Sequence, residues 1–193
     1  MTALVLCGGK STRMGRPKAF LPYRGTTMIT HITELTKRLF SEVLLVTNEP
    51  EAFDGLEIDT VKDILPHRGP LGGILSGLLI ASHQQCFVIA CDMPFIDEKL
   101  ISEMVKKKHT GDMLVLMHEK GIEPLIGIYS KSCIRALEES LFAGQTSLND
   151  FASGLNAKVF FYSEPASKNN KGFLPPYFDV DTPQDYTAAI MCK

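Results

Sequence analysis

Short apolar runs recur along the chain, and stretches with helical periodicity lie between them. The runs have the length of strands: Ala3–Cys7, Val43–Thr47, Cys86–Cys91, Met113–Met117, Leu125–Tyr129 and Val159–Tyr162. Apolar residues spaced three or four positions apart predict helices over Met28–Leu39, Leu71–Leu79 and Leu100–Val105. The early runs are apolar on both faces, and strands that alternate with helices favour a mainly parallel sheet covered on both sides. We therefore expect an α/β fold that forms one domain over residues 1–193.

Composition narrows the partners that such a domain can bind. The 193 residues include 20 Lys and Arg against 22 Asp and Glu, and this net charge of −2 gives no general affinity for nucleic acid. No apolar stretch approaches the roughly 18 residues that cross a membrane, and no signal-peptide pattern opens the chain. The five cysteines are odd in number and lack CxxC spacing, which indicates reduced thiols. We expect a cytoplasmic protein whose partners include neither nucleic acid nor a membrane.

A glycine-rich, basic loop follows the first apolar run. The segment Leu6–Lys18 contains three glycines and four cations, and no acid appears before Glu34. Glycines allow backbone N–H groups to approach phosphate oxygens, and Arg and Lys add charge-assisted bonds, so the segment predicts a triphosphate cradle. The spacing matches neither a Walker A loop, since Leu4 stands where glycine is needed, nor the G-x-G-x-x-G pattern. The alternative is a strand-to-helix loop with solvated cations.

A second candidate segment joins an acid to a glycine-rich helix start. Val61 and Lys62 are followed by Asp63 in a predicted loop, and Gly69, Gly72, Gly73 and Gly77 leave the next helix with little side-chain bulk. Close approach of a flat ligand would explain these glycines, and tight packing of the helix on the sheet would explain them equally well.

Three aspartates lie where the sequence offers no structural role for them. Asp92 ends a buried run, and Asp97 is better placed to cap the next helix, so Asp92 is available as a hard oxygen ligand for Mg²⁺. Asp179 and Asp181 are spaced i, i+2 in an extended segment, so their side chains point the same way and form a candidate metal or substrate pair. A plain acidic turn is the alternative.

The ends of the chain differ in charge and carry other local signals. Residues 1–33 contain cations without any acid, whereas residues 173–185 contain three aspartates without any base. Thr182 with Pro183 predicts the cap of a last helix through Ile190. The polar, proline-rich segment Ser163–Pro176 predicts a long loop. If the fold brings the two ends together, a cationic phosphate cradle faces acids that hold a metal.

These segments resemble the molybdenum cofactor guanylyltransferase family of nucleotidyltransferases. The first loop is similar to that family's L-A-G-G-x-S-x-R-M-G-x-x-K, and the likeness continues in order through Gly69–Gly73, Cys91–Pro94, Glu123–Tyr129 and Val180–Asp185. The resemblance implies a three-layer, Rossmann-like nucleotidyltransferase fold. It also implies transfer of GMP from MgGTP to the phosphate of molybdopterin with release of pyrophosphate, and it suggests partners in molybdoenzyme maturation.

The resemblance assigns roles to positions that match the family's motifs. Nucleotide-binding positions would be Leu6, Cys7, Gly8, Gly9, Lys18, Asn48, Asp63 and Asp92, with Leu6–Gly8 on the guanine and ribose side. Arg13, Lys18 and Asp92 would be the catalytic residues. Asp92 would hold Mg²⁺, and Asp181 is a second candidate ligand.

Two departures from the family pattern leave alternatives open. Cys7 replaces an alanine, and Asp179 and Asp181 replace two asparagines. Acids at the latter positions are common in related cytidylyl- and sugar nucleotidyltransferases, so a cytidylyltransferase or sugar-phosphate nucleotidyltransferase of the same fold is the first alternative. The opening Leu6–Gly9 favours guanine, because cytidine-specific relatives carry P-A-A-G there. The second alternative is a non-catalytic nucleotide-binding or sensing protein.

Overall fold

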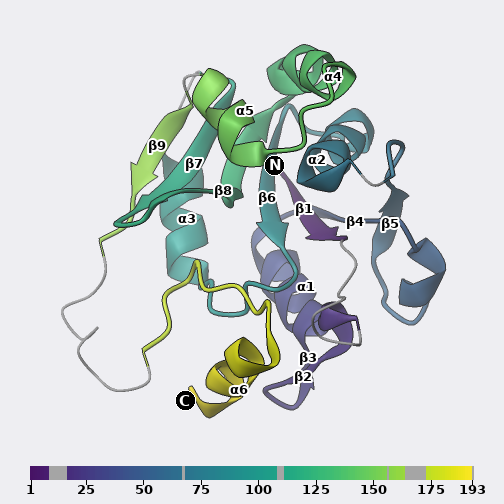
Figure 1. Ribbon diagram of the computed structural model, residues 1–193. Helices are drawn as coiled ribbons and strands as arrows, with labels where there is room; N and C mark the ends of the chain where they lie inside the picture. Colours follow the sequence, from purple (N-terminus) through teal and green to yellow (C-terminus); the bar gives the residue numbers. More distant parts are fainter. Residues whose placement is uncertain (9–16, 67, 108–110, 156, 164–172, 193) are drawn as a thin grey trace.

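A single mixed sheet organises the part of the chain that the computed structural model describes, which is residues 1–8, 17–66, 68–107, 111–155, 157–163 and 173–192 (Figure 1). Seven strands lie in the order β5-β4-β1-β6-β8-β7-β9. Their bounds are β1 Thr2–Cys7, β4 Glu42–Thr47, β5 Asp59–Lys62, β6 Gln85–Ala90, β7 Met113–His118, β8 Gly121–Ser130 and β9 Lys158–Phe161. All neighbouring strands run parallel except β8, which is antiparallel to β6 and β7. The predicted mainly parallel α/β fold is therefore confirmed.

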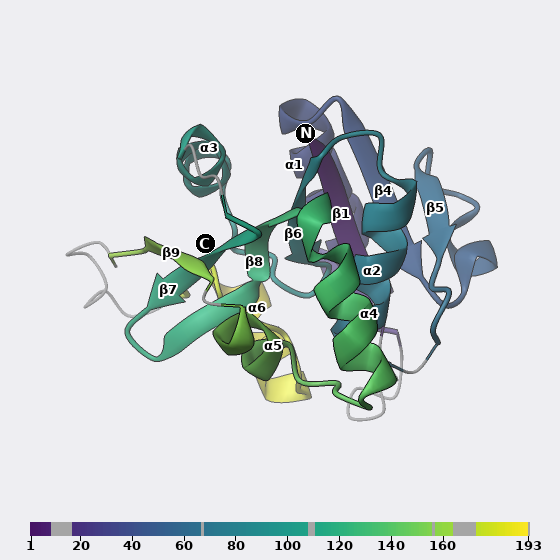
Figure 2. The same ribbon diagram turned by 90° about the horizontal axis from the view of Figure 1, so that it is seen from above.

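Helices cover both faces of this sheet, which gives three layers (Figure 2). The helices are α1 Met28–Leu39, α2 Gly69–Ile80, α3 Glu98–Lys106, α4 Ile134–Phe142, α5 Leu148–Gly154 and α6 Pro183–Met191. One buried core joins α1 and α3 to the sheet, and the other joins α2, α4 and α5 to its opposite face. Successive residues of β1 alternate between them: Val5 lies in the first core, and Leu4 lies in the second. Each such burial stabilises the fold by about 1.5–3 kcal/mol.

Short elements connect the strands and helices of these layers. They are the 3₁₀ turns η1 Lys18–Phe20, η2 Pro50–Phe53 and η3 Lys131–Cys133, and the two-stranded ribbon of β2 Pro22–Tyr23 and β3 Thr26–Thr27. The predicted caps are present, since the Asp97 side chain accepts a hydrogen bond from the Leu100 N–H at 2.7 Å and Thr182 forms a capping box with Asp185. No helix among the described residues has both the length and the apolar character needed to cross a membrane.

The glycines of α2 are explained by packing. A Cβ on Gly72 would lie 2.9 Å from the Leu65 carbonyl oxygen, and a Cβ on Gly77 would lie 2.6 Å from a Leu4 methyl carbon. The first glycine lets the helix approach the loop after β5, and the second lets it approach β1. Of the two explanations offered by the sequence, the structure supports close packing of the helix.

The strands β1, β4, β5 and β6 run parallel, so their carboxyl ends lie on the same side of the sheet. The exits of β1, β4, β5 and β6 all open there, as expected for a ligand site in an open α/β sheet. Helix α6, near the C-terminus, lies below the sheet in the view of Figure 1.

Candidate active site

The C-terminal segment is fixed to the exit of β6, and this contact forms the candidate site. The Val180 N–H donates a hydrogen bond of 2.9 Å to the Asp92 carbonyl oxygen. Val180 is fully buried in a small core with Leu21, Tyr23, Met28 and Ala189. Because Leu21 follows η1 directly, the same core holds the Lys18 turn and the Asp181 segment side by side.

Lys18 lies between two of the predicted carboxylates. Its Nζ is 3.2 Å from Asp92 Oδ2 and also bonds to Asp181 Oδ1. The exposed fractions of the side chains are 17% for Lys18, 22% for Asp92 and 41% for Asp181. Burial acts to lower the pKa of Lys18, but its bond with Asp181 and the charge of Asp92 outweigh burial and raise that pKa. The ammonium therefore stays charged, and the expected meeting of the basic and acidic ends of the chain is confirmed for Lys18 and Asp181.

Two further carboxylates face this group, and each has a raised pKa. Burial raises the pKa of Glu123 to about 7, and the charges of Asp179 and Asp92 act in the same direction. Partial burial and the nearby Asp181 raise the pKa of Asp179. The hydrogen bond that Glu123 accepts from the Leu125 N–H at 3.0 Å only partly offsets these effects. Sequence reasoning gave Glu123 no role, because its position opposite Asp92 depends on the pairing of β8 with β6.

The donor set of this site fits a hard divalent cation. Asp92 and Asp181 direct carboxylate oxygens at one positive centre, the Lys18 ammonium. Within the described residues, no group of three His, Cys, Asp or Glu side chains is placed to bind a metal. Two protein carboxylates are nevertheless a typical set for Mg²⁺, which completes its octahedral shell with substrate phosphates and water.

The predicted nucleotide-binding positions at the β1 exit lie beside Asn48. Leu6 and Cys7 are nearly buried, Gly8 is exposed, and a Cβ on Gly8 would lie 3.9 Å from Asn48 Nδ2. Asn48 follows β4 directly, and its buried Oδ1 has no hydrogen-bond partner among the described residues. A buried acceptor without a donor costs about 1–3 kcal/mol. An N–H or O–H donor of a bound nucleotide would remove this cost.

Asp63 lies at the same edge but has other partners. It is 8% exposed, and its Oδ1 accepts a hydrogen bond from the Leu65 N–H at 3.0 Å and lies 3.1 Å from the Ser76 hydroxyl. These contacts position the start of α2, and a nucleotide contact of Asp63 stays a prediction. Gly9 and Arg13 lie outside the described residues.

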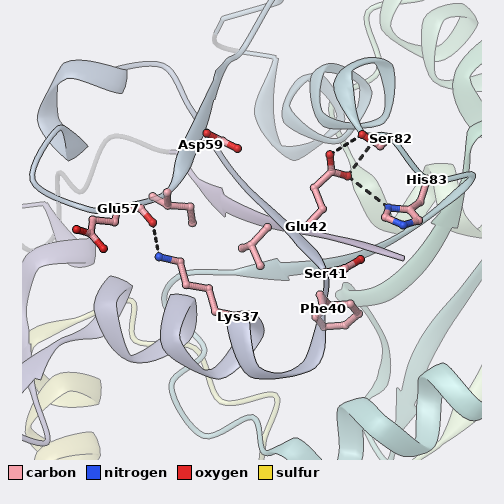
Figure 3. A pocket seen from close by; sticks show the side chains of 10 residues that line it. Lys37, Phe40, Ser41, Glu42, Glu57, Asp59, Ser82 and His83 are labelled. Carbon is pink, nitrogen blue, oxygen red and sulfur yellow. Dashed lines mark hydrogen bonds and ion pairs between the residues drawn. The ribbon is translucent and has the colours of Figure 1, made fainter.

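A polar pocket of about 830 Å³ lies at the opposite ends of the strands, where β4 and β5 begin (Figure 3). There the Glu42 carboxylate accepts hydrogen bonds from the Ser82 hydroxyl at 2.7 Å, from the Ser82 N–H at 3.0 Å and from Thr2. His83 Nδ1 lies 3.5 Å from Glu42. The Glu42 carboxylate in this pocket already accepts hydrogen bonds from three donors, so we place the functional site at the carboxyl ends of the strands.

The chain is similar to known nucleotidyltransferases over most of its length. The family model described as MobA-like NTP transferase domain matches residues 3–158. A probable molybdenum cofactor guanylyltransferase of Pelotomaculum thermopropionicum is 36% identical over 188 residues, which cover 97% of this chain and 91% of the relative. A second protein with that description, from Clostridium perfringens, is 32% identical over 193 residues, or 100% of this chain and 97% of the relative.

A solved structure shares the fold. Molybdopterin-guanine dinucleotide biosynthesis protein A from Archaeoglobus fulgidus superposes with a TM-score of 0.80 at 24% identity, covering 99% of this chain and 97% of that chain. The three-layer nucleotidyltransferase fold expected from the sequence is thereby confirmed. The matched model spans β1, the Lys18 turn, Asp92 and Glu123, which are most of the elements that build the site. The chain therefore belongs to the MobA-like NTP transferase domain family.

Proposed function

We propose that this protein transfers GMP from GTP to the phosphate of molybdopterin and releases pyrophosphate. The observation that carries the proposal is the Lys18 ammonium between Asp92 and Asp181, at the strand edge where the nucleotide loop begins. The descriptions of the relatives as guanylyltransferases support GTP as donor and a molybdenum cofactor precursor as acceptor. A non-catalytic sensing protein loses support, because the family is one of transferases.

The reaction requires positioning and charge neutralisation. An oxygen of the acceptor phosphate attacks the α-phosphorus of GTP, and the bond to the bridging oxygen breaks in line, so that pyrophosphate leaves. Lys18 and Arg13 neutralise the growing negative charge on the phosphates. Leu6–Gly9 line the guanine and ribose, and Asn48 and Asp63 orient the nucleotide.

Mg²⁺ is the proposed metal, held by Asp92 with Asp181 as second ligand. When bound, it supplies Lewis-acid stabilisation of the phosphate oxygens. Lys18 competes for the same two carboxylates, so it would turn from them toward the phosphates when MgGTP binds. The proposal therefore gives Lys18 two successive partners.

A panel of the four nucleoside triphosphates tests the donor. Calorimetric titration with and without Mg²⁺, followed by pyrophosphate release with molybdopterin present, is expected to give the tightest binding and the fastest release with GTP. Tighter binding of CTP would overturn the assignment. That result would favour a cytidylyltransferase instead. The specific observation in support of this candidate is the presence of acids at Asp179 and Asp181.

A further inference from the structure

Two cysteine thiols meet where the nucleotide loop and the catalytic carboxylate begin. Cys7 ends β1, and Cys91 directly follows β6. Their sulfur atoms are 3.2 Å apart. Cys7 belongs to the proposed guanine-binding residues Leu6–Gly9, and Cys91 directly precedes the proposed metal ligand Asp92, so the pair joins both halves of the candidate site.

The backbone places these sulfurs within reach of a disulfide. β1 and β6 are parallel neighbours whose register pairs Leu6 with Ala90, and the Cys91 N–H continues this ladder to the Leu6 carbonyl at 3.0 Å. Neighbouring strands lie about 4.8 Å apart, which falls inside the Cα separation of roughly 4.4–6.8 Å that disulfides span. Both side chains also point to the same face of the sheet, since both belong to the core under α1 and α3.

We propose that Cys7 and Cys91 are a redox modification site, at which a hydroperoxide converts the two thiols into a reversible disulfide that weakens MgGTP binding. Only the affinity readout rests on the proposed function, because the disulfide itself requires no substrate. A site of this kind differs from a structural disulfide, since the reduced pair is the form that binds nucleotide.

The oxidation balances with hydrogen peroxide as the two-electron oxidant. The O–O bond breaks as one thiol is oxidised to a sulfenic acid and a first water leaves. The second sulfur then attacks the sulfenic sulfur, its proton joins the departing hydroxide as a second water, and the S–S bond forms. Cys7 and Cys91 are 8% and 7% exposed, whereas Cys86 and Cys133 are at 0%, so the small oxidant reaches the proposed pair more easily than the two inner thiols.

The consequence for binding follows from the distances involved. Closing a contact of 3.2 Å to a disulfide of about 2.05 Å moves the two sulfurs together by about 1 Å. The part of this movement that side-chain rotation does not absorb shifts the ends of β1 and β6, and with them Gly8 and Asp92. A misplacement of about 1 Å in a catalytic site can lower the reaction rate on the order of 100-fold. For the displaced nucleotide contacts we expect a loss of MgGTP affinity of a similar size, roughly 10- to 100-fold.

The test uses the full chain, purified with reduced thiols. After treatment with hydrogen peroxide and alkylation of the remaining thiols, peptide mapping without reductant is expected to find the Cys7 and Cys91 peptides joined. Calorimetry is expected to show the loss of MgGTP affinity, and dithiothreitol is expected to restore it. The variant Cys91→Ala should bind MgGTP like the reduced wild type and keep that affinity in peroxide. Cys192→Ser, a matched change outside the pair, should leave both the link and the response intact.

Several results would overturn the proposal. Wild-type protein in which both thiols remain alkylatable, or are oxidised further without joining, has no such site. A mapped disulfide that leaves MgGTP affinity unchanged removes the link to binding. If the reduced protein binds no GTP, the proposed function fails, and the peptide map of the wild type still decides whether the pair forms, even where Cys91→Ala does not fold.

Discussion

Two carboxylates at opposite ends of the strands of one sheet have pKa values that are shifted in opposite directions. Glu42, at the amino ends of the strands, has its pKa lowered to about 2, because bonds from Thr2, Ser82 and His83 outweigh the effect of burial. Glu123, at the carboxyl ends, has its pKa raised to about 7 by burial and by neighbouring carboxylates. One edge surrounds its acid with donors. The other collects acids around Lys18, an arrangement that becomes favourable when a further cation binds.

The comparison indicates that the carboxylates around Lys18 lower the stability of the fold and serve the function. Removing groups from the acid-rich edge should impair nucleotide chemistry, and at Glu123 it should also stabilise the protein. Removing Glu42 should only destabilise the protein.

The largest expected effect is that of Asp92→Asn on catalysis. The amide keeps the shape of the side chain but removes the charge that attracts the metal, so pyrophosphate release from GTP should fall by about 100- to 1000-fold. Asp97→Asn is the matched control in the same loop, since Asp97 caps α3, and the amide oxygen of asparagine can also serve as a cap. Release rates of the two variants near the wild-type value would remove the metal role from Asp92.

Glu123→Gln should stabilise the metal-free protein at neutral and alkaline pH. The folded pKa of about 7 lies above the ordinary 4.5, so the wild type loses stability as pH rises from 4.5 through 7. The uncharged amide avoids this loss, and its oxygen can still accept from the Leu125 N–H. We expect an advantage of about 3 kcal/mol at pH 8 that nearly disappears below pH 4.5.

Urea unfolding at pH 5 and pH 8 with a chelator present measures this difference. An advantage that is independent of pH would show that the Glu123 carboxyl is not held protonated by its surroundings. A wild type more stable than Glu123→Gln at pH 8 would reverse the sign of the comparison between the two edges.

Lys18→Met should increase the affinity for a divalent metal in the absence of nucleotide. The ammonium bonds to Asp92 and Asp181, so its removal takes away a cation that competes with the metal at both carboxylates, and we expect roughly tenfold tighter binding of Mn²⁺. Transfer should nevertheless slow, because the phosphates lose a cation. Spectroscopic titration with Mn²⁺ gives the affinity, and Lys62→Met, a change of an exposed lysine on β5, is the control. Weaker metal binding in Lys18→Met would contradict the proposed competition.

The layered fold could be predicted because its strands are strongly apolar, whereas weaker elements could not. Strand β5 was not predicted. It is the outermost strand on one side of the sheet, and only Val61 of its four residues is buried, so the sequence carries no apolar run there. Helices α4 and α5 were not predicted either, although buried residues such as Leu137 and Phe151 join them to the second core. The antiparallel direction of β8 was not predicted either, because an apolar run contains no information about its direction.

The candidate site could be predicted in its parts but not in its assembly. Lys18, Asp92 and Asp181 each carried a chemical signal in the sequence, and opposite charge suggested that the two ends meet. Their meeting depends on the hydrogen bond from Val180 to the Asp92 carbonyl, which is a backbone contact without a side-chain signature. The raised pKa of Glu123 depends on burial and neighbours that exist only in the folded chain.

The smallest expected effect concerns the donor-rich edge. Glu42→Gln should lower the free energy of unfolding at pH 7 by about 1 kcal/mol, a modest value because the carboxylate is partly exposed to water. The folded pKa of about 2 lies below the ordinary 4.5, so this contribution is complete above pH 4.5 and is lost as pH falls toward 2. The difference between variant and wild type should therefore shrink over that range, while pyrophosphate release at pH 7 stays unchanged. Glu57→Gln is the control in the same pocket, because Glu57 accepts a bond from Lys37 through its backbone carbonyl. Two results would contradict the proposed difference between the two sites. One is an equal loss of unfolding free energy in Glu42→Gln and Glu57→Gln, and the other is a loss in Glu42→Gln that grows as the pH falls.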